Sequence, residues 1–210
     1  MTRRIGLLGG SFNPAHGAHR QISLEALAAL GLDEVWWLVS PGNPLKSPRG
    51  MAPLPVRYAS AQRMARRAPI RPTAIERELR TRYTYDTVRR LVRRYPDIRF
   101  VWLMGADNLA QFDRWENWRG IARTLAIAVI ARPPYNDAAR AATAMGWLRR
   151  FVRPASQARE WTHWSLPALV LLRFRPDPRS ATLARAADPD WHRHVPVTGL
   201  RDRLTRRPLS

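Results

Sequence analysis

A strand-to-helix turn near the start of the chain limits the folds that the sequence can adopt. The apolar run at residues 5–8 ends at two glycines, Gly9 and Gly10. Asn13 then precedes Pro14, and a residue before proline is pushed out of the α region, which forces a turn. Apolar residues at helical spacing follow over residues 17–30. The sequence therefore predicts a buried strand, a tight turn and a helix, in that order.

Two histidines, His16 and His19, lie at the start of the predicted helix, three residues apart. Residues at this spacing share one face of a helix, so both imidazoles can point at one spot beyond the strand. Free backbone N–H groups and the positive end of the helix dipole make that spot suitable for an anion such as phosphate. The alternatives are an ordinary helix surface and half of a metal site. No third His or Cys stands at ligand spacing, which argues against zinc.

The alternation of strand and helix continues along the chain. Apolar runs typical of buried parallel strands occupy residues 34–39, 98–104, 125–131 and 168–172, and a short edge strand fits residues 68–72. Helical patterns start at Pro55 and occupy residues 85–95, 137–151, 180–187 and 198–205, whereas residues 76–83 look irregular. This order predicts an α/β protein of one domain, residues 1–210, with a Rossmann-like, doubly wound, mainly parallel sheet and helices on both faces.

In such sheets, ligands bind beyond the carboxyl ends of the strands. The unusual residues that follow predicted strand ends would all lie on that rim: Gly9, Gly10, Ser11, Lys46, Gly105, Asp107 and Arg132. Lys46 is the single lysine among 36 basic residues, and its place in a loop indicates a phosphate contact.

The formal net charge of +20 allows two interpretations. A basic chain can bind nucleic acid, or it can handle small polyphosphate substrates. The arginines are spread along the chain without a separate basic tail, which makes nucleic acid the less favoured main partner.

The chain has no cysteine, which excludes disulfides, thiolate zinc sites and cysteine nucleophiles. The N-terminal apolar run is too short for a signal peptide, and no stretch approaches the roughly 20 apolar residues of a membrane helix. We therefore expect a cytoplasmic protein.

Residues 9–19, Gly-Gly-Ser-Phe-Asn-Pro-Ala-His-Gly-Ala-His, resemble the N-terminal signature of the nucleotidyltransferase superfamily. Further motifs look like those of the bacterial nicotinate-nucleotide adenylyltransferases: residues 44–46, 82–84, 105–109, Phe112, Trp115 and 132–133. Residues 180–185 are similar to the superfamily's Ser-x-Thr-x-x-Arg phosphate-binding element.

The resemblance implies a transferase of NAD biosynthesis that joins nicotinate mononucleotide to ATP and releases deamido-NAD and pyrophosphate. The mononucleotide phosphate, already anionic, would attack the α-phosphorus of ATP in line, without a general base or a covalent intermediate. Positioning and charge stabilisation would then supply the catalysis. Mg²⁺ would bridge phosphate oxygens and be held mainly by substrate and water, with no metal ligand from the protein.

By the same resemblance, His16 and His19 are the catalytic residues, with His19 nearest the reacting centre. The residues implied to bind ATP and its phosphates are Gly9, Gly10, Ser11, Phe12, Lys46, Gly105, Asp107, Arg132, Ser180, Thr182 and Arg185. Those implied to bind nicotinate mononucleotide are Tyr83, Thr84 and Trp115. The segment from about residue 175 to 210 would form a small helical phosphate-binding subregion. Trp115 could instead be a packing residue, Asp107 a helix cap, and the match at 180–185 a product of chance.

Two positions depart from the family pattern. Ala18 stands where the histidine motif usually has glycine, and Arg179 stands where an apolar residue usually precedes Ser180. The rival functions are adenylyl transfer to nicotinamide mononucleotide or phosphopantetheine, and a basic nucleic-acid-binding protein. Assembly into a homo-oligomer is left open.

Overall fold

Every apolar run predicted as a strand lies in one seven-stranded sheet of the computed structural model, which describes residues 2–42, 50–130, 137, 140–174 and 179–209. The strands are β1 (Arg3–Gly10), β2 (Glu34–Val39), β3 (Ile70–Thr73), β4 (Ile98–Gly105), β5 (Ala126–Ile130), β6 (Val152–Arg153) and β7 (Leu169–Leu172). Their order is β3-β2-β1-β4-β5-β7-β6, with parallel pairing between these neighbours. Chain order runs outward from the central pair β1 and β4, except that β6 lies outside β7 at one edge, so the switch point lies between β1 and β4 and the predicted doubly wound fold is confirmed.

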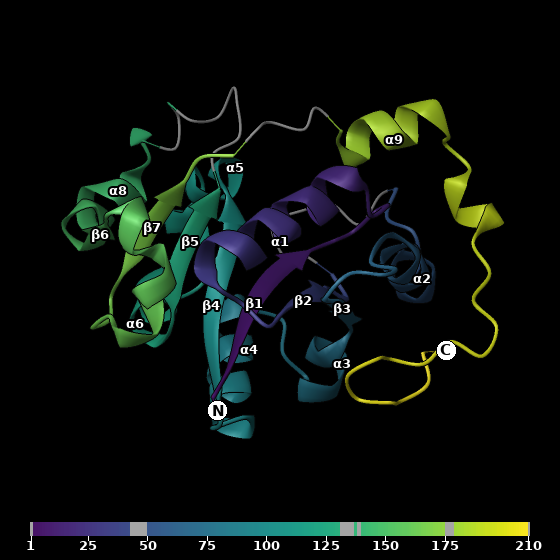
Figure 1. Cartoon of the computed structure of the whole chain (residues 1–210). Helices are drawn as coiled ribbons and strands as arrows, with labels where there is room; N and C mark the ends of the chain where they lie inside the picture. The colour runs from purple at the N-terminus through teal and green to yellow at the C-terminus, as the bar shows by residue number, and fades with distance from the viewer. Residues whose placement is uncertain (1, 43–49, 131–136, 138–139, 175–178, 210) are drawn as a thin grey trace.

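Helices cover both faces of this sheet, as Figure 1 shows. One face packs against α1 (Gly17–Leu30), α2 (Leu54–Met64) and the 3-10 helix η3 (Ala155–His163). The other packs against α3 (Ile75–Leu79), α4 (Thr84–Arg94), α5 (Ala106–Leu109), α6 (Trp118–Thr124) and α8 (Thr143–Leu148). Shorter or peripheral helices are η1 (Phe112–Arg114), η2 (Arg149–Phe151), α9 (Ala181–Ala187) and η4 (Trp191–His194). Within the described ranges, no helix is long and apolar enough to cross a bilayer.

Two apolar cores form because successive residues of a strand point to opposite faces of the sheet. In β1, Leu8 joins the core beneath α1, as does Trp37 of β2, whereas Trp36 joins the core beneath α4. Both indoles are almost fully buried and both are hydrogen-bonded: Trp37 Nε1 donates to Ser23 Oγ at 2.8 Å, and Trp36 Nε1 donates to Glu34 Oε2 at 2.9 Å. The central strands are therefore held firmly on both sides, and their carboxyl ends form a fixed base for the loops above.

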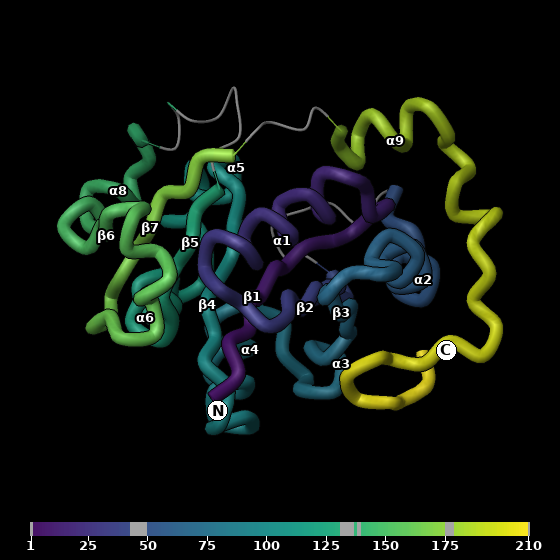
Figure 2. The backbone as a smooth tube through the Cα atoms, viewed as in Figure 1, coloured from purple at the N-terminus to yellow at the C-terminus, as the bar shows by residue number. Residues whose placement is uncertain are grey.

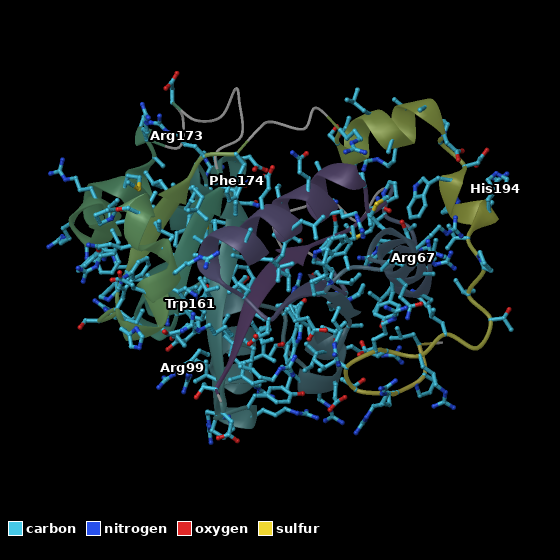
Figure 3. The ribbon with its side chains drawn as sticks, in the orientation of Figure 1. Arg67, Arg99, Trp161, Arg173, Phe174 and His194 are labelled. Carbon is cyan, nitrogen blue, oxygen red and sulfur yellow. The ribbon has the colours of Figure 1, made fainter. Side chains whose placement is uncertain are left out.

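The helix predicted at residues 17–30 and the strand predicted at 34–39 have those bounds in the structure. Gly31 ends α1 in the left-handed region, with φ +60°, and donates its N–H to the carbonyl of Leu27. Trp161 of η3 lies beside this end of the helix (Figure 3), where its Nε1 donates to the Leu30 carbonyl at 3.0 Å. The C-terminal end of α1 is thus fixed, which orients its N-terminal end over β1.

Two predictions of regular structure are wrong in the middle of the chain. Residues 76–83 were expected to be irregular, but α3 forms there because Ile75 and Leu79 bury one side of a helix too short to show periodicity. The single helix expected at 137–151 is interrupted among its described residues. Ala142 has extended backbone, with φ −57° and ψ 140°, so α8 starts only at Thr143. The short strand β6 had no counterpart among the predicted elements.

The helix expected at residues 198–205 is also wrong, because long-range contacts hold this segment in turns. The buried Asp202 carboxylate accepts hydrogen bonds from the Thr73 hydroxyl and from the backbone N–H of Ala74. Leu209 is buried in the core beneath α1 and α2. Figure 2 shows the C-terminal segment running down past α2 and closing beside α3 at the β3 edge of the sheet.

Candidate active site

A cleft of about 940 Å³ opens above the carboxyl ends of β1 and β4. Most of the predicted site residues line it: Gly9, Gly10, Ser11, Phe12, His16, His19, Tyr83, Thr84, Gly105, Asp107, Trp115, Ser180 and Thr182. Arg185 lies next to it and donates from Nη1 to the Asn13 carbonyl at 2.7 Å. Lys46 and Arg132 lie outside the described residues. The structure thus brings into one cleft residues that are far apart in the sequence.

The loop between β1 and α1 forms the floor of the cleft around Phe12. This residue is 1% exposed and has a left-handed backbone, with φ +48°, which is uncommon for a bulky side chain. Its ring stacks on Trp37 with centroids 5.0 Å apart and leans on His19 at 4.7 Å. A side chain on Gly9 would meet the Trp102 ring, so only glycine lets that indole approach the end of β1. Aromatic packing therefore fixes the backbone beneath the cleft.

The two histidines face one another at the start of α1. His16 is the N-cap residue, and its ring centroid lies 3.8 Å from that of His19. The backbone N–H of His16 donates to Nδ1 of His19 at 3.2 Å. Because Nδ1 must offer a lone pair for this bond, the proton of a neutral His19 is on Nε2, which is then a hydrogen-bond donor. Ala18 is 2% exposed inside α1 and leaves this pairing intact.

Arg57 supports the same loop from below, and the sequence reasoning did not identify it. This α2 side chain is 1% exposed, and Nη1 donates to the carbonyls of Ser11 and Ser40, both at 2.7 Å. Burial lowers the pKa of its guanidinium to about 10. Arginine is common throughout this chain, so residue type gave no signal. An arginine within the apolar pattern of a helix was the only available sign.

The opposite wall of the cleft comes from the start of α4. Tyr83 is the N-cap residue of α4 and Thr84 is its first residue, one position before the expected start at residue 85. Behind them, the carboxyl of Glu76 is buried and hydrogen-bonded to the Thr87 hydroxyl at 3.1 Å. This burial raises the pKa of Glu76 to about 7. Trp115 is half-buried and lines this side of the cleft.

The contacts of Trp115 and Asp107 distinguish a structural role from a place in the cleft. The Trp115 ring packs edge-on against Trp102 and Phe112, with centroids 6.1 and 5.4 Å away, so it both packs and lines the cleft. Asp107 is not the helix cap that was considered as its alternative role, since Gly105 is the N-cap residue of α5. The Asp107 carboxylate instead folds back over Gly105, where a side chain would collide with Oδ1.

The start of α9 lies beside the first turn of α1, where Arg179 and Ser180 line a small pocket together with His16. Ser180 caps α9 by accepting the Leu183 N–H at 3.2 Å, and Arg185 Nη2 reaches the Thr182 hydroxyl at 3.4 Å. The side chain of Arg179 does not enter a core but lies over Gly17, at the first turn of α1. Arg179, which replaces the apolar residue usual at this position, therefore adds a guanidinium to this side of the cleft.

The described residues include no group of three or more His, Asp or Glu side chains placed to hold a metal ion. Mg²⁺ commonly keeps several waters and binds through substrate phosphates, which needs no such group.

Comparisons with known proteins agree with this geometry. The cytidylyltransferase-like family model matches residues 7–187. A probable nicotinate-nucleotide adenylyltransferase of Erythrobacter litoralis is 62% identical over 208 residues, which are 99% of this chain and 95% of that protein. A protein of the same description from Parvibaculum lavamentivorans is 50% identical over 87% of this chain and 90% of its own.

Solved structures support the fold. The Plasmodium falciparum nicotinic acid mononucleotide adenylyltransferase complexed with NaAD matches with a TM-score of 0.64 at 16% identity, over 88% of this chain and 83% of that one. At 16% identity, this structural similarity supports the fold only. Together, the family model and the two close relatives show that the chain belongs to the cytidylyltransferase-like family and, within it, to the nicotinate-nucleotide adenylyltransferases.

Proposed function

We propose that this protein transfers the adenylyl group of ATP to nicotinate mononucleotide, giving deamido-NAD and pyrophosphate in NAD biosynthesis. The observation that carries the proposal is the single cleft that joins the His16–His19 pair to the start of α4 and to Trp115. One end offers donors for phosphates, and the other offers an aromatic face and helix N–H groups for a carboxylated ring. The relatives at 62% and 50% identity carry the same activity in their descriptions.

At the phosphate end, the chain supplies hydrogen-bond donors and positive charge. His19 would donate from Nε2 to an oxygen on the α-phosphorus, and the backbone at Gly10, Ser11 and Phe12 would line the transferring group. The first turn of α1 contains no acidic residue, so its N–H groups and dipole favour an anion there. Catalysis would come from holding the attacking phosphate in line and stabilising charge, without a base.

Other predicted phosphate ligands would act on the leaving group. The hydroxyls of Ser180 and Thr182 line the cleft and are close to Arg185, so we assign all three to the β- and γ-phosphates. Lys46 and Arg132 are assigned to phosphate as well, on the sequence resemblance. Mg²⁺, when bound, would neutralise charge on the phosphate oxygens, with water and those oxygens as its ligands.

At the other end, Trp115 would stack on the nicotinate ring. The backbone N–H groups near Thr84, at the positive end of α4, would bind the ring carboxylate. Asp107 would face a ribose hydroxyl. We also propose that residues 1–210 act as one nucleotidyltransferase domain in the cytoplasm, with ATP and nicotinate mononucleotide rather than nucleic acid as the main partners.

The test is product analysis with the purified protein, ATP, Mg²⁺ and nicotinate mononucleotide. We expect deamido-NAD and pyrophosphate in equal amounts, identified by mass and by a coupled pyrophosphate assay. A protein that is folded and binds ATP but forms neither product would refute the proposal.

A further inference from the structure

Arg57 is a buried cation that the reaction scheme does not use. Its side chain is 1% exposed, and among the described residues all its hydrogen-bond acceptors are main-chain carbonyls. Nη1 donates to Ser11 and to Ser40 at 2.7 Å each, Nε donates to Ala52 at 2.8 Å, and Nη2 lies 3.4 Å from the carbonyl of Pro41. Although burial lowers its pKa to about 10, the guanidinium is still charged at neutral pH.

No carboxylate balances this charge among the residues that the structure describes. The sequence between residues 35 and 75 also contains no Asp or Glu at all. A buried charge is costly unless it is paired, so a cation held only by carbonyl dipoles is unusual. Ser11 and Ser40 both line the cleft, which places this positive charge directly beneath the floor on which anionic phosphates would lie.

The hydrogen bond to Ser11 also fixes the direction of a peptide. The Ser11 carbonyl and the Phe12 N–H belong to one trans peptide, in which the two groups point in opposite directions. Arg57 draws the carbonyl toward itself and does not line the cleft, so the Phe12 N–H points to the cleft side. Phe12 is held there with φ +48°, a backbone conformation that is unfavourable for a residue with a bulky side chain. Strain of this kind persists only where the surroundings impose it.

The same guanidinium joins two loops. Ser11 belongs to the β1–α1 loop, whereas Ser40, Pro41 and Ala52 belong to the β2–α2 connection. A planar fork with five N–H groups can hold carbonyls from both at once, which an ammonium group cannot do with the same geometry.

We propose that Arg57 is a positioning residue for adenylyl transfer: it holds the Ser11–Phe12 peptide so that the Phe12 N–H donates to the phosphoryl group in the transition state. This inference rests on the proposed function. The residue acts through the backbone and through its charge beneath the floor, and it does not touch the substrate. A donor of this kind strengthens as charge develops, so its loss lowers kcat more than it weakens ATP binding.

The test compares Arg57→Lys with a matched control, Arg20→Lys. Arg20 also donates to two main-chain carbonyls, those of Met64 and Arg66 at 3.1 and 2.8 Å, but it does not line the cleft or contact its loops. For Arg57→Lys we expect kcat to fall by about 100-fold, the typical effect of losing one such donor, while the Kd for ATP changes by less than about threefold. Arg20→Lys is expected to keep kcat within about twofold. An Arg57→Lys variant with kcat near that of the wild type would overturn the proposal, as would a rise in Kd without loss of kcat.

A second measurement covers the case in which the variant does not fold, as judged by its melting curve. In the wild-type protein, the Phe12 amide resonance is followed by NMR while ATP alone is added. We expect a downfield shift of the Phe12 amide proton, larger than that of an α2 amide such as Gln62, and an unshifted Phe12 amide would contradict the inference. This readout needs no acceptor. A shift without deamido-NAD synthesis would therefore reject the proposed acceptor and retain the Phe12 N–H as the donor that Arg57 is proposed to position.

Discussion

Replacing Glu76 by glutamine should make the protein more stable at alkaline pH. Glu76 is 9% exposed, and the one hydrogen-bond partner of its carboxyl among the described residues is the Thr87 hydroxyl, at 3.1 Å. Desolvation disfavours the charged form more than this single bond favours it, so the pKa rises from 4.5 to about 7. Glutamine keeps the size and the hydrogen bond but cannot ionise.

Proton linkage gives the sign and the size of the change in the free energy of unfolding with pH. Between pH 4.5 and about 7, the folded carboxyl binds a proton that the unfolded one has lost, so the free energy of unfolding falls as pH rises. The loss is complete above the folded pKa. At 1.36 kcal/mol per pKa unit, it amounts to roughly 3 kcal/mol. The stability of Glu76→Gln minus that of the wild type should therefore rise by about this amount from pH 4.5 to pH 8.

The assay is urea unfolding of both proteins at pH 4.5, 6, 7 and 8, because comparing the two at each pH cancels the titration of shared groups. Glu160→Gln, which removes an exposed carboxylate of η3, controls for the change in net charge. A difference between Glu76→Gln and the wild type that stays flat across this range would contradict the prediction, because it would mean that folding leaves the pKa of Glu76 unchanged.

Three further substitutions test separate parts of the structure. His19→Ala should keep its melting temperature within a few degrees and lose on the order of 10²–10³-fold in kcat, since one phosphate donor is removed; steady-state rates near those of the wild type would exclude His19 from the mechanism. Asp202→Ala should lower the free energy of unfolding by about 3 kcal/mol in urea titrations, because buried donors at Thr73 and neighbouring backbone lose their acceptor. An unchanged midpoint would show that the tail is not anchored there. Gly105→Ala should displace the Asp107 carboxylate and raise the KM for a nucleotide substrate several-fold with little change in melting temperature, and an unaltered KM would separate Asp107 from nucleotide binding.

The elements that the sequence predicted well have strong local signals. The helix at 17–30 has a long apolar pattern and a glycine, Gly31, at the position where a left-handed backbone ends it. The strand at 34–39 is a continuous apolar run buried on both faces. The cleft could be anticipated in outline for the same reason, because parallel strands bring their carboxyl ends to one edge and the motifs follow those ends.

What the sequence could not show depends on contacts between distant residues. Asp202 holds its segment in turns by bonding to Thr73, which is 129 positions away, and no local pattern distinguishes that from a helix. Arg57 is one arginine among many, and its role appears only once the carbonyls of two separate loops converge on it. The raised pKa of Glu76 likewise arises from burial that the irregular reading of residues 76–83 did not anticipate.

Competition between acceptors shows which substrate the cleft adenylylates. The wild-type protein is given ATP, Mg²⁺ and equal concentrations of nicotinate mononucleotide, nicotinamide mononucleotide and phosphopantetheine, and the adenylylated products are separated and quantified by mass. We expect deamido-NAD as the dominant product, because the proposed site at the start of α4 binds a carboxylate through backbone N–H groups, and neither nicotinamide mononucleotide nor phosphopantetheine has a carboxylate. A dominant product made from nicotinamide mononucleotide or phosphopantetheine would contradict this expectation.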